Sequence, residues 1–252
     1  MTIPAPSIAS ETLFSIGTFE IRNTMLMAWA AMTVITVIAL AARATRYKLV
    51  PGRLQAFFEY GVETLFDFTD SVLGDRKAAR FFFPFIATLF LFILIANWLG
   101  IIPGLATITI EGVHNGHPVE IPVIRSMNAD VNMTLVFALM AIIGAQVTGL
   151  LTIGILPHLR KYLIAPWEPP YAIGTMIGVL EIVSELSRVL SFTFRLFGNI
   201  FAGEVLLVVI SFLVPYVLPI PFYGLEVFVG FVQALVFAML SLVFLKMAMT
   251  SH

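Results

Sequence analysis

Long apolar segments separated by short polar ones run through most of this chain. Five of them cover residues 24–42, 81–102, 132–157, 171–212 and 222–249. Each is long enough to cross a membrane, because about 20 apolar residues in a helix span the hydrocarbon core of a bilayer. The pattern predicts an all-α, polytopic membrane protein in which residues 1–252 form a single membrane domain.

The fourth apolar segment is too long for a simple crossing. Pro169 and Pro170 precede it and Pro215 follows it. A helix could therefore continue for about 42 residues, or ~63 Å at 1.5 Å per residue. Because the hydrocarbon core is only ~30 Å thick, such a helix has to be steeply tilted, kinked or broken. The following turn, 215–221, is short, so we expect the last two segments to form a long, tilted antiparallel hairpin.

Residues 53–74 have a different pattern. Their acidic residues recur at spacings of four, four and three: Glu59, Glu63, Asp67 and Asp70. These spacings place one acidic stripe on a helix, with aromatic and aliphatic residues on the rest of its surface. The pattern favours an amphipathic helix at the inner membrane surface. An ordinary solvated helix face explains the stripe equally well, so we assign it no chemistry.

Two β-prone runs surround Asn115-Gly116 in the long loop after the second crossing. Asn-Gly between such runs predicts a β-hairpin. His114 and His117 flank the turn. Two histidines alone make a weak metal site, and we interpret them as exposed turn residues.

Composition agrees with a membrane protein. Hydrophobic residues make up 60% of the chain and charged residues 12%, and the mean hydropathy is +1.00. The chain has no cysteine, which excludes disulfides and thiolate metal sites. Its basic residues form no cluster of the kind that binds nucleic acid.

The distribution of basic residues predicts the orientation. Residues 43–80 carry Arg43, Arg46, Lys48, Arg53, Arg76, Lys77 and Arg80, and the loop after the third crossing carries Arg160 and Lys161. The tail over residues 1–23 has only Arg22, and the 103–130 loop only Arg125. Because Lys and Arg accumulate in cytoplasmic loops, we expect a periplasmic N-terminus and a cytoplasmic C-terminus. The first residues lack the pattern of a cleaved signal, so the first crossing is expected to be retained.

Polar residues follow one side of the fourth segment. They step by three or four: Glu181, Ser184, Glu185, Arg188, Ser191, Arg195 and Asn199. Glu204 lies nine residues beyond Arg195 and therefore on the opposite face, nearer the outer end. In the last segment Glu226 and Gln233 are seven apart and share a face.

Arg195 is the most informative of these residues. A guanidinium stays charged in proteins, and at the centre of a membrane helix it costs roughly 2.5–3.5 kcal/mol on insertion scales. No acidic residue lies within one helical turn of Arg195, so its countercharge has to come from elsewhere in the chain or from another protein. With carboxyl groups toward both membrane surfaces, this fixed cation separates two half-paths, which suits a machine that passes protons through a moving partner.

Plainer interpretations remain open for the other polar residues. Glu181, Glu185 and Arg188 have the spacing of structural ion pairs on a helix, and Arg188 could contact lipid phosphate. Glu204 and Glu226 could share one proton as a clamp between helices. Asn199 and Gln233 could be no more than an interhelical hydrogen bond.

The string Arg195-Leu196-Phe197-Gly198-Asn199-Ile200-Phe201-Ala202-Gly203-Glu204 closely resembles the signature of subunit a of F-type ATP synthases, the stator subunit of the membrane sector. Supporting matches are Phe92-Ile93-Leu94-Ile95-Ala96-Asn97-Trp98-Leu99-Gly100-Ile101-Ile102-Pro103-Gly104, Ala129-Asp130-Val131-Asn132-Met133-Thr134 and Gln233-Ala234. The matches cover the chain from about residue 80 to its end. The N-terminal third matches only in layout.

The resemblance implies specific roles in proton translocation. Arg195 is similar to the essential arginine that faces the proton-carrying carboxylate of the c-ring, and Asn199 and Gln233 match polar positions near it. Glu204 and Glu226 occupy positions of the outer half-channel, and Glu181 a position of the inner one. Weaker candidates are Glu185, Arg188, Ser184, Ser191 and Asp130. The implied partners are the c-ring, peripheral-stalk b-type subunits and the lipid bilayer of a bacterial inner membrane, with no cofactor, metal or nucleic acid.

The main alternative is a stand-alone proton-coupled secondary transporter. It would need a substrate pocket and usually paired repeats, and the sequence offers neither. It would also be active alone, whereas a stator subunit is inert without its ring. No P-loop or triad of metal ligands is present, so we expect the chain to be non-catalytic on its own.

Overall fold

The structure, a computed structural model, describes residues 10–44, 52–114, 117–156 and 171–249. The helices are α1 (Asn23–Ala44), α2 (Arg53–Leu73), α3 (Arg76–Ile101), α4 (Val131–Ile153), α6 (Tyr171–Leu213) and α7 (Pro219–Met249). Two short 3₁₀ helices, η1 (Leu105–Thr107) and η2 (Met127–Ala129), lie in the loop between α3 and α4. Of the described helices, α1, α3, α4, α6 and α7 are long and apolar enough to cross a membrane, which confirms the predicted all-α polytopic class.

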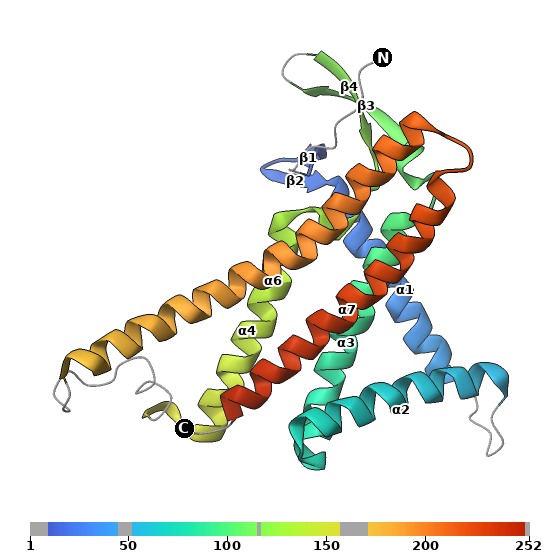
Figure 1. Cartoon of the computed structure of the whole chain (residues 1–252). Helices are drawn as coiled ribbons and strands as arrows, with labels where there is room; N and C mark the ends of the chain where they lie inside the picture. Colours follow the sequence, from blue (N-terminus) through green and yellow to red (C-terminus); the bar gives the residue numbers. More distant parts are fainter. Residues whose placement is uncertain (1–9, 45–51, 115–116, 157–170, 250–252) are drawn as a thin grey trace.

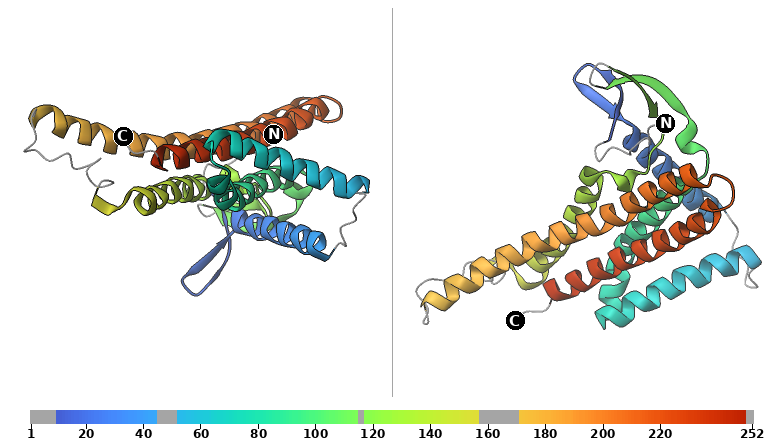
Figure 2. Two further views of the ribbon diagram at one scale, coloured as in Figure 1. Left: turned by 90° about the horizontal axis from the view of Figure 1, so that it is seen from below. Right: turned by 45° about the horizontal axis from the view of Figure 1, so that its top comes forward.

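The crossing helices lie in layers (Figures 1 and 2). The long α6 and α7 run side by side as an antiparallel hairpin and cover α3 and α4, and α1 packs on the other side of α3. Small side chains let these helices approach closely. Ala138 and Ala141 of α4 and Ala234 of α7 are fully buried around Leu196 and Phe237. The hairpin predicted from the proline-bounded turn is therefore confirmed.

The fourth crossing is one continuous helix of 43 residues. It contains no proline, so no backbone hydrogen bond is lost and nothing forces a break. At 1.5 Å per residue it is about 64 Å long, roughly twice the thickness of the hydrocarbon core. Such a helix has to lie obliquely, and Figure 1 shows α6 crossing α4 at a slant.

Some helices begin or end at other residues than predicted, because residues at their termini set these limits. Helix α3 begins five residues before position 81, because the Asp75 side chain accepts a hydrogen bond of 2.9 Å from the backbone N–H of Lys77. Helix α7 begins at Pro219, since proline needs no N–H partner in the first turn. Helix α4 ends at Ile153, followed by Gly154 at φ 95°. The predicted end at position 157 lies outside the described residues.

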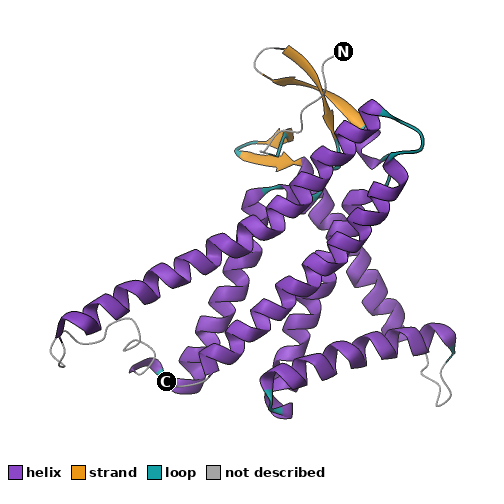
Figure 3. Cartoon of the chain, in the orientation of Figure 1, coloured by secondary structure: helices purple, strands orange, loops and turns teal. Residues whose placement is uncertain are grey.

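The two described sheets are hairpins at one end of the molecule (Figure 3). Strands β3 (Thr109–His114) and β4 (His117–Pro122) pair antiparallel, which confirms the predicted hairpin, although the turn at 115–116 lies outside the described residues. Strands β1 (Thr12–Ile16) and β2 (Phe19–Arg22) form a second one. We predicted only a tail here. The missed signal is Gly17, whose φ of 66° suits a two-residue turn.

The predicted interfacial segment forms helix α2. Its second half packs against α3 and α7 through Phe66 and Leu73, and Lys246 Nζ donates a hydrogen bond of 2.7 Å to the carbonyl of Val72. In the first half, Phe57 and Tyr60 are exposed. Exposed aromatic side chains of this kind are typical of an amphipathic helix that lies on a membrane surface. Its place at the inner membrane surface stays a prediction.

Asp130 holds the outer ends of two helices together. Its carboxylate caps α4 by accepting a hydrogen bond of 2.9 Å from the backbone N–H of Asn132. It also accepts one of 3.3 Å from the hydroxyl of Thr24, at the start of α1. Both Asp130 and Thr24 are buried, so the hydrogen bond between them is sheltered from water.

Asp130→Ala should lower the free energy of unfolding by about 1–3 kcal/mol, because it removes a helix cap and leaves buried donors without an acceptor. Asp75→Ala, which removes the exposed cap of α3, is the matched control and should cost about 0.5–1 kcal/mol. Thermal unfolding in detergent, followed by circular dichroism, measures both. Equal losses in the two variants would contradict the double role of Asp130.

Candidate functional site

Arg195 lies on an exposed face of α6. One turn to either side of it, Ser191 and Asn199 are also exposed, and Leu190 and Phe194, further round the helix, are each more than half exposed. The guanidinium donates one hydrogen bond of 3.3 Å to Ser191 Oγ, one turn earlier. Among the residues that the structure describes, no acidic side chain forms an ion pair with Arg195. In the part of the chain that the structure describes, the fold therefore keeps this cation away from the acidic side chains.

Glu204 forms an ion pair on the opposite side of α6. Arg125 Nε lies 3.0 Å from Glu204 Oε1, and a second guanidinium nitrogen lies 3.2 Å from Oε2. The Arg125 side chain is 5% exposed and that of Glu204 is 27% exposed. The nine-residue spacing predicted this opposite face correctly. Arg125 was not predicted as a site residue, although it is the one Lys or Arg between α3 and α4.

Glu226 packs directly on α6 beside Glu204. It is buried, with 6% of its surface exposed. A Cβ atom built on Gly203 would collide with both oxygens of the Glu226 carboxylate. Glycine at position 203 thus makes room for this carboxyl group, and it places Glu226 of α7 next to the turn of α6 that carries Glu204.

Asn199 and Gln233 connect the Arg195 face to the interior. Asn199 Nδ2 donates a hydrogen bond of 2.7 Å to Gln233 Oε1. Asn199 is exposed one turn beyond Arg195, whereas Gln233 is buried. The Nε2 atom of Gln233 is buried and has no hydrogen-bond partner among the described residues. The interhelical hydrogen bond considered from the sequence is present, and it joins two residues that the resemblance assigned to the site.

Two buried asparagines extend this polar region toward the hairpins. Asn128 Nδ2 donates a hydrogen bond of 2.6 Å to Asn97 Oδ1, and Asn97 Nδ2 donates one of 3.0 Å to the carbonyl of Gly230. Ser126 Oγ and Asn128 Oδ1 are buried without a protein partner in the described chain. Such atoms are where ordered water binds in protein interiors. Asn97 could have been identified from its polarity inside the 81–102 segment.

The N-terminal half of α6 carries a second ion pair. Arg188 lies 2.6 Å from Glu185 Oε1 at a spacing of three residues, and its guanidinium sits 5.3 Å from the centre of the Phe244 ring of α7. The structural ion pair that the spacing of Glu185 and Arg188 allowed is therefore present. Glu181 and Ser184 lie half-buried one turn nearer the start of α6.

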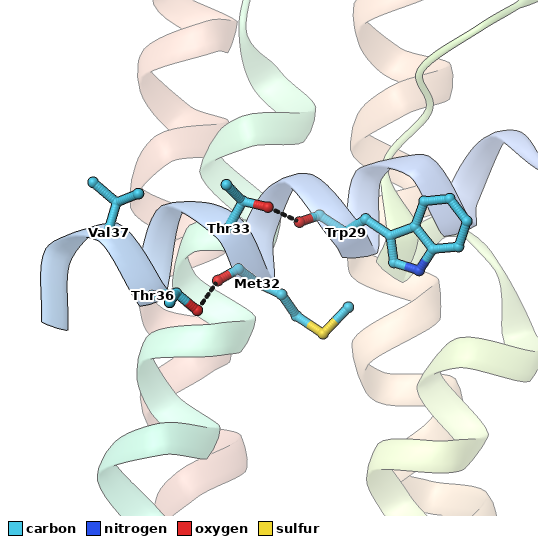
Figure 4. Close-up of a pocket in the computed structure, with 5 residues that line it drawn as sticks. All are labelled: Trp29, Met32, Thr33, Thr36 and Val37. Carbon is cyan, nitrogen blue, oxygen red and sulfur yellow. Dashed lines mark hydrogen bonds between the residues drawn. The ribbon is translucent and has the colours of Figure 1, made fainter. Parts of the chain in front are cut away.

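A shallow pocket of about 380 Å³ lies on α1 and is lined by Trp29, Met32, Thr33, Thr36 and Val37. Figure 4 shows that both hydroxyls are engaged within their own helix. Thr33 donates to the Trp29 carbonyl at 2.8 Å and Thr36 to the Met32 carbonyl at 2.7 Å. The pocket carries no charged or catalytic group, so it is a poor substrate site. Within the described residues, no three potential ligands gather to hold a metal ion.

The sequence is similar to known proteins over nearly its whole length. The family model of the ATP synthase A chain matches residues 25–246. ATP synthase subunit a of Syntrophobacter fumaroxidans is 33% identical over 238 residues, covering 94% of this chain and 88% of that protein. The subunit a of Acidothermus cellulolyticus is 31% identical over 260 residues, or 98% of this chain and 88% of the relative. That of Campylobacter jejuni is 32% identical over 215 residues, 85% of either chain.

Gly203→Ala should displace the Glu226 carboxylate, because the new Cβ occupies its place and the side chain can swing away. Gly224→Ala is the matched control, since a Cβ there meets open space. The control should stabilise the protein by about 0.5–1 kcal/mol through helix propensity. Gly203→Ala should lack this gain, and it should recover the gain in a Glu226→Ala background. Thermal unfolding in detergent tests this, and equal stabilisation by both glycine replacements would refute the close contact.

Proposed function

The chain belongs to the ATP synthase subunit a family, and from that premise we propose that it is the proton-conducting stator subunit of a rotary F-type ATP synthase. As such it is an integral membrane subunit of the complex and carries out no catalysis itself. It provides two offset half-channels that lead to a carboxylate of the c-ring, and Arg195 separates them.

The exposed, unpaired position of Arg195 carries this proposal. A guanidinium cannot neutralise itself by losing a proton, and it is costly at membrane depth without a countercharge. The described chain supplies only the Ser191 hydroxyl as its partner. A carboxylate on a neighbouring subunit satisfies this requirement, and the exposure of Arg195 on α6 leaves it accessible to such a neighbour.

The outer half-channel uses the carboxyl groups near the outer ends of α6 and α7. Protons enter past Glu226 and Glu204 and reach the level of Arg195 beside Asn199 and Gln233. There they protonate a c-ring carboxylate, which becomes neutral. A neutral carboxyl can face lipid at a far lower cost than a carboxylate, so the ring turns with it through the bilayer.

The inner half-channel receives the ring carboxyl after nearly a full turn. Arg195 favours the ionised carboxylate, since opposite charges at short distance stabilise each other. The released proton leaves past Glu181, with Ser184, Glu185 and Ser191 lining the way. Arg188 holds Glu185 in place, and Asp130 anchors α4 and α1 rather than carrying protons. Direct hopping between the half-channels is blocked, because a proton beside Arg195 meets a like charge.

The proposed function also implies an orientation of the chain in the membrane and further partner subunits. The β-hairpins and the N-terminus face the periplasm of a bacterial inner membrane, and the C-terminus and α2 face the cytoplasm. The basic residues around α2 support this orientation. Peripheral-stalk b-type subunits hold the chain still while the ring moves.

Arg195→Ala should abolish ATP-driven proton pumping by the purified, reconstituted complex, because the ring carboxylate loses its partner and the half-channels are no longer separated. Arg195→Lys should also fail or be badly impaired, since an ammonium can deprotonate and lacks the planar fork. Arg22→Ala, which removes an exposed cation with an exposed partner, is the control and should pump normally. Normal pumping by the Arg195→Ala complex would refute the proposed function.

Glu204→Gln combined with Glu226→Gln should slow proton entry from the outer side by on the order of tenfold or more, because both carboxyl groups of the outer half-channel are lost. Glu20→Gln, on the exposed strand β2, is the control. ATP synthesis driven by an imposed pH gradient measures the effect in vesicles. An unchanged rate would make both glutamates structural residues.

A further inference from the structure

The ion pair between Arg125 and Glu204 has the geometry of a tight, specific contact. Both oxygens of Glu204 accept N–H groups of the same guanidinium, at 3.0 and 3.2 Å. Two parallel bonds of this kind fix the orientation of a carboxylate as well as its charge. The guanidinium is almost completely buried, with 5% of the side chain exposed, so this is not a surface ion pair.

The loop that carries Arg125 is anchored to three other helices. Immediately after it, Asn128 binds Asn97 of α3, and Asn97 binds the carbonyl of Gly230 in α7. Asp130 then caps α4 and binds Thr24 of α1. Arg125 is therefore presented to α6 from a fixed support, and Glu204 is held at a set distance from its neighbours.

One guanidinium, that of Arg125, and the carboxyl groups of Glu204 and Glu226 lie where α6 meets α7 and the loop before α4. Helix α4, which packs beside α6, has no charged residue. Asp130 is occupied with its own hydrogen bonds. The remaining groups are Arg125, Glu204 and Glu226, and together they are neutral when exactly one carboxyl carries a proton. Glu204 is satisfied as a carboxylate by the guanidinium, whereas Glu226 makes no hydrogen bond or ion pair within the described chain.

We infer that Arg125 is a positioning residue of the outer half-channel: it holds Glu204 as a paired carboxylate, so that Glu226 is the carboxyl that takes up and passes on the proton. The inference rests on the proposed function and divides the work between its two outer glutamates. A buried carboxylate without a partner is costly in a medium of low dielectric, so the single proton resides on Glu226. Glu204 then attracts the next proton into the channel without trapping it.

The test compares six variants in intact complexes reconstituted into vesicles: Arg125→Gln, Arg125→Lys, Glu204→Gln, Glu226→Gln, Arg125→Gln with Glu204→Gln, and Arg195→Ala. ATP synthesis is driven by an acid outer side and expressed per assembled complex. Arg125→Gln should lower the rate by on the order of tenfold or more, because it leaves the half-buried Glu204 carboxylate without its partner. Arg125→Lys, which keeps the charge, should retain most of the rate.

The double variant gives the decisive comparison. If Arg125 acts through Glu204, then Arg125→Gln should have no further effect once Glu204 is neutral, and the double variant should equal Glu204→Gln alone. Losses that multiply would overturn the inference, since Arg125 would then act independently of Glu204. Because the double variant leaves no unpaired charge, it also decides the matter if Arg125→Gln alone does not assemble.

The single glutamate variants test the division of work. Glu226→Gln should lose more activity than Glu204→Gln, because only Glu226 carries the proton. An equal loss in both would indicate a proton shared between the glutamates and would overturn the inference. Arg195→Ala distinguishes the proposed function from the role of Arg125. If this variant synthesises ATP normally, the proposed function fails. If it is inactive while Arg125→Gln is normal, only the role of Arg125 fails.

Discussion

Arg195 carries a permanent positive charge in a helix that is long and apolar enough to cross a membrane, and such a charge needs a countercharge. Arg195 is exposed on α6, and its partner in the described chain is a serine hydroxyl. The function proposed above supplies the countercharge from a neighbouring subunit. The continuous helix α6 and its hairpin with α7 hold Arg195 on the surface of the fold.

The other cations of the membrane region show the contrast. Arg125 and Arg188 are paired with Glu204 and Glu185 inside the chain, and Arg188 also packs on Phe244. These pairs neutralise charge locally, and they fix carboxylates at defined levels on either side of Arg195. From its N-terminal to its C-terminal half, α6 thus carries a paired cation, a cation without an ion-pair partner among the described residues, and a paired carboxylate. In the proposed function this order gives the two half-paths different ends.

The polar groups between these charges are held by tertiary contacts rather than by neighbours in sequence. Asn199 reaches across to Gln233, and Asn97 links Asn128 to Gly230. Gly203 admits the Glu226 carboxylate against the backbone of α6. Close helix packing on small residues makes these contacts possible, because only a short distance between backbones lets short polar side chains span the gap.

The sequence predicted the crossings, the long hairpin and the opposite face of Glu204, because these follow from local periodicity and from the length of a helix against the thickness of a bilayer. It also showed that no acidic residue lies within one helical turn of Arg195, but not where the countercharge comes from. It did not determine the hairpin of residues 12–22, the double role of Asp130, or the pairing of Arg125 with Glu204 across 79 positions. Only the tertiary structure decided those. A countercharge on another element leaves no periodic trace in the sequence, since the loop that brings it there is placed by packing on helices far along the chain.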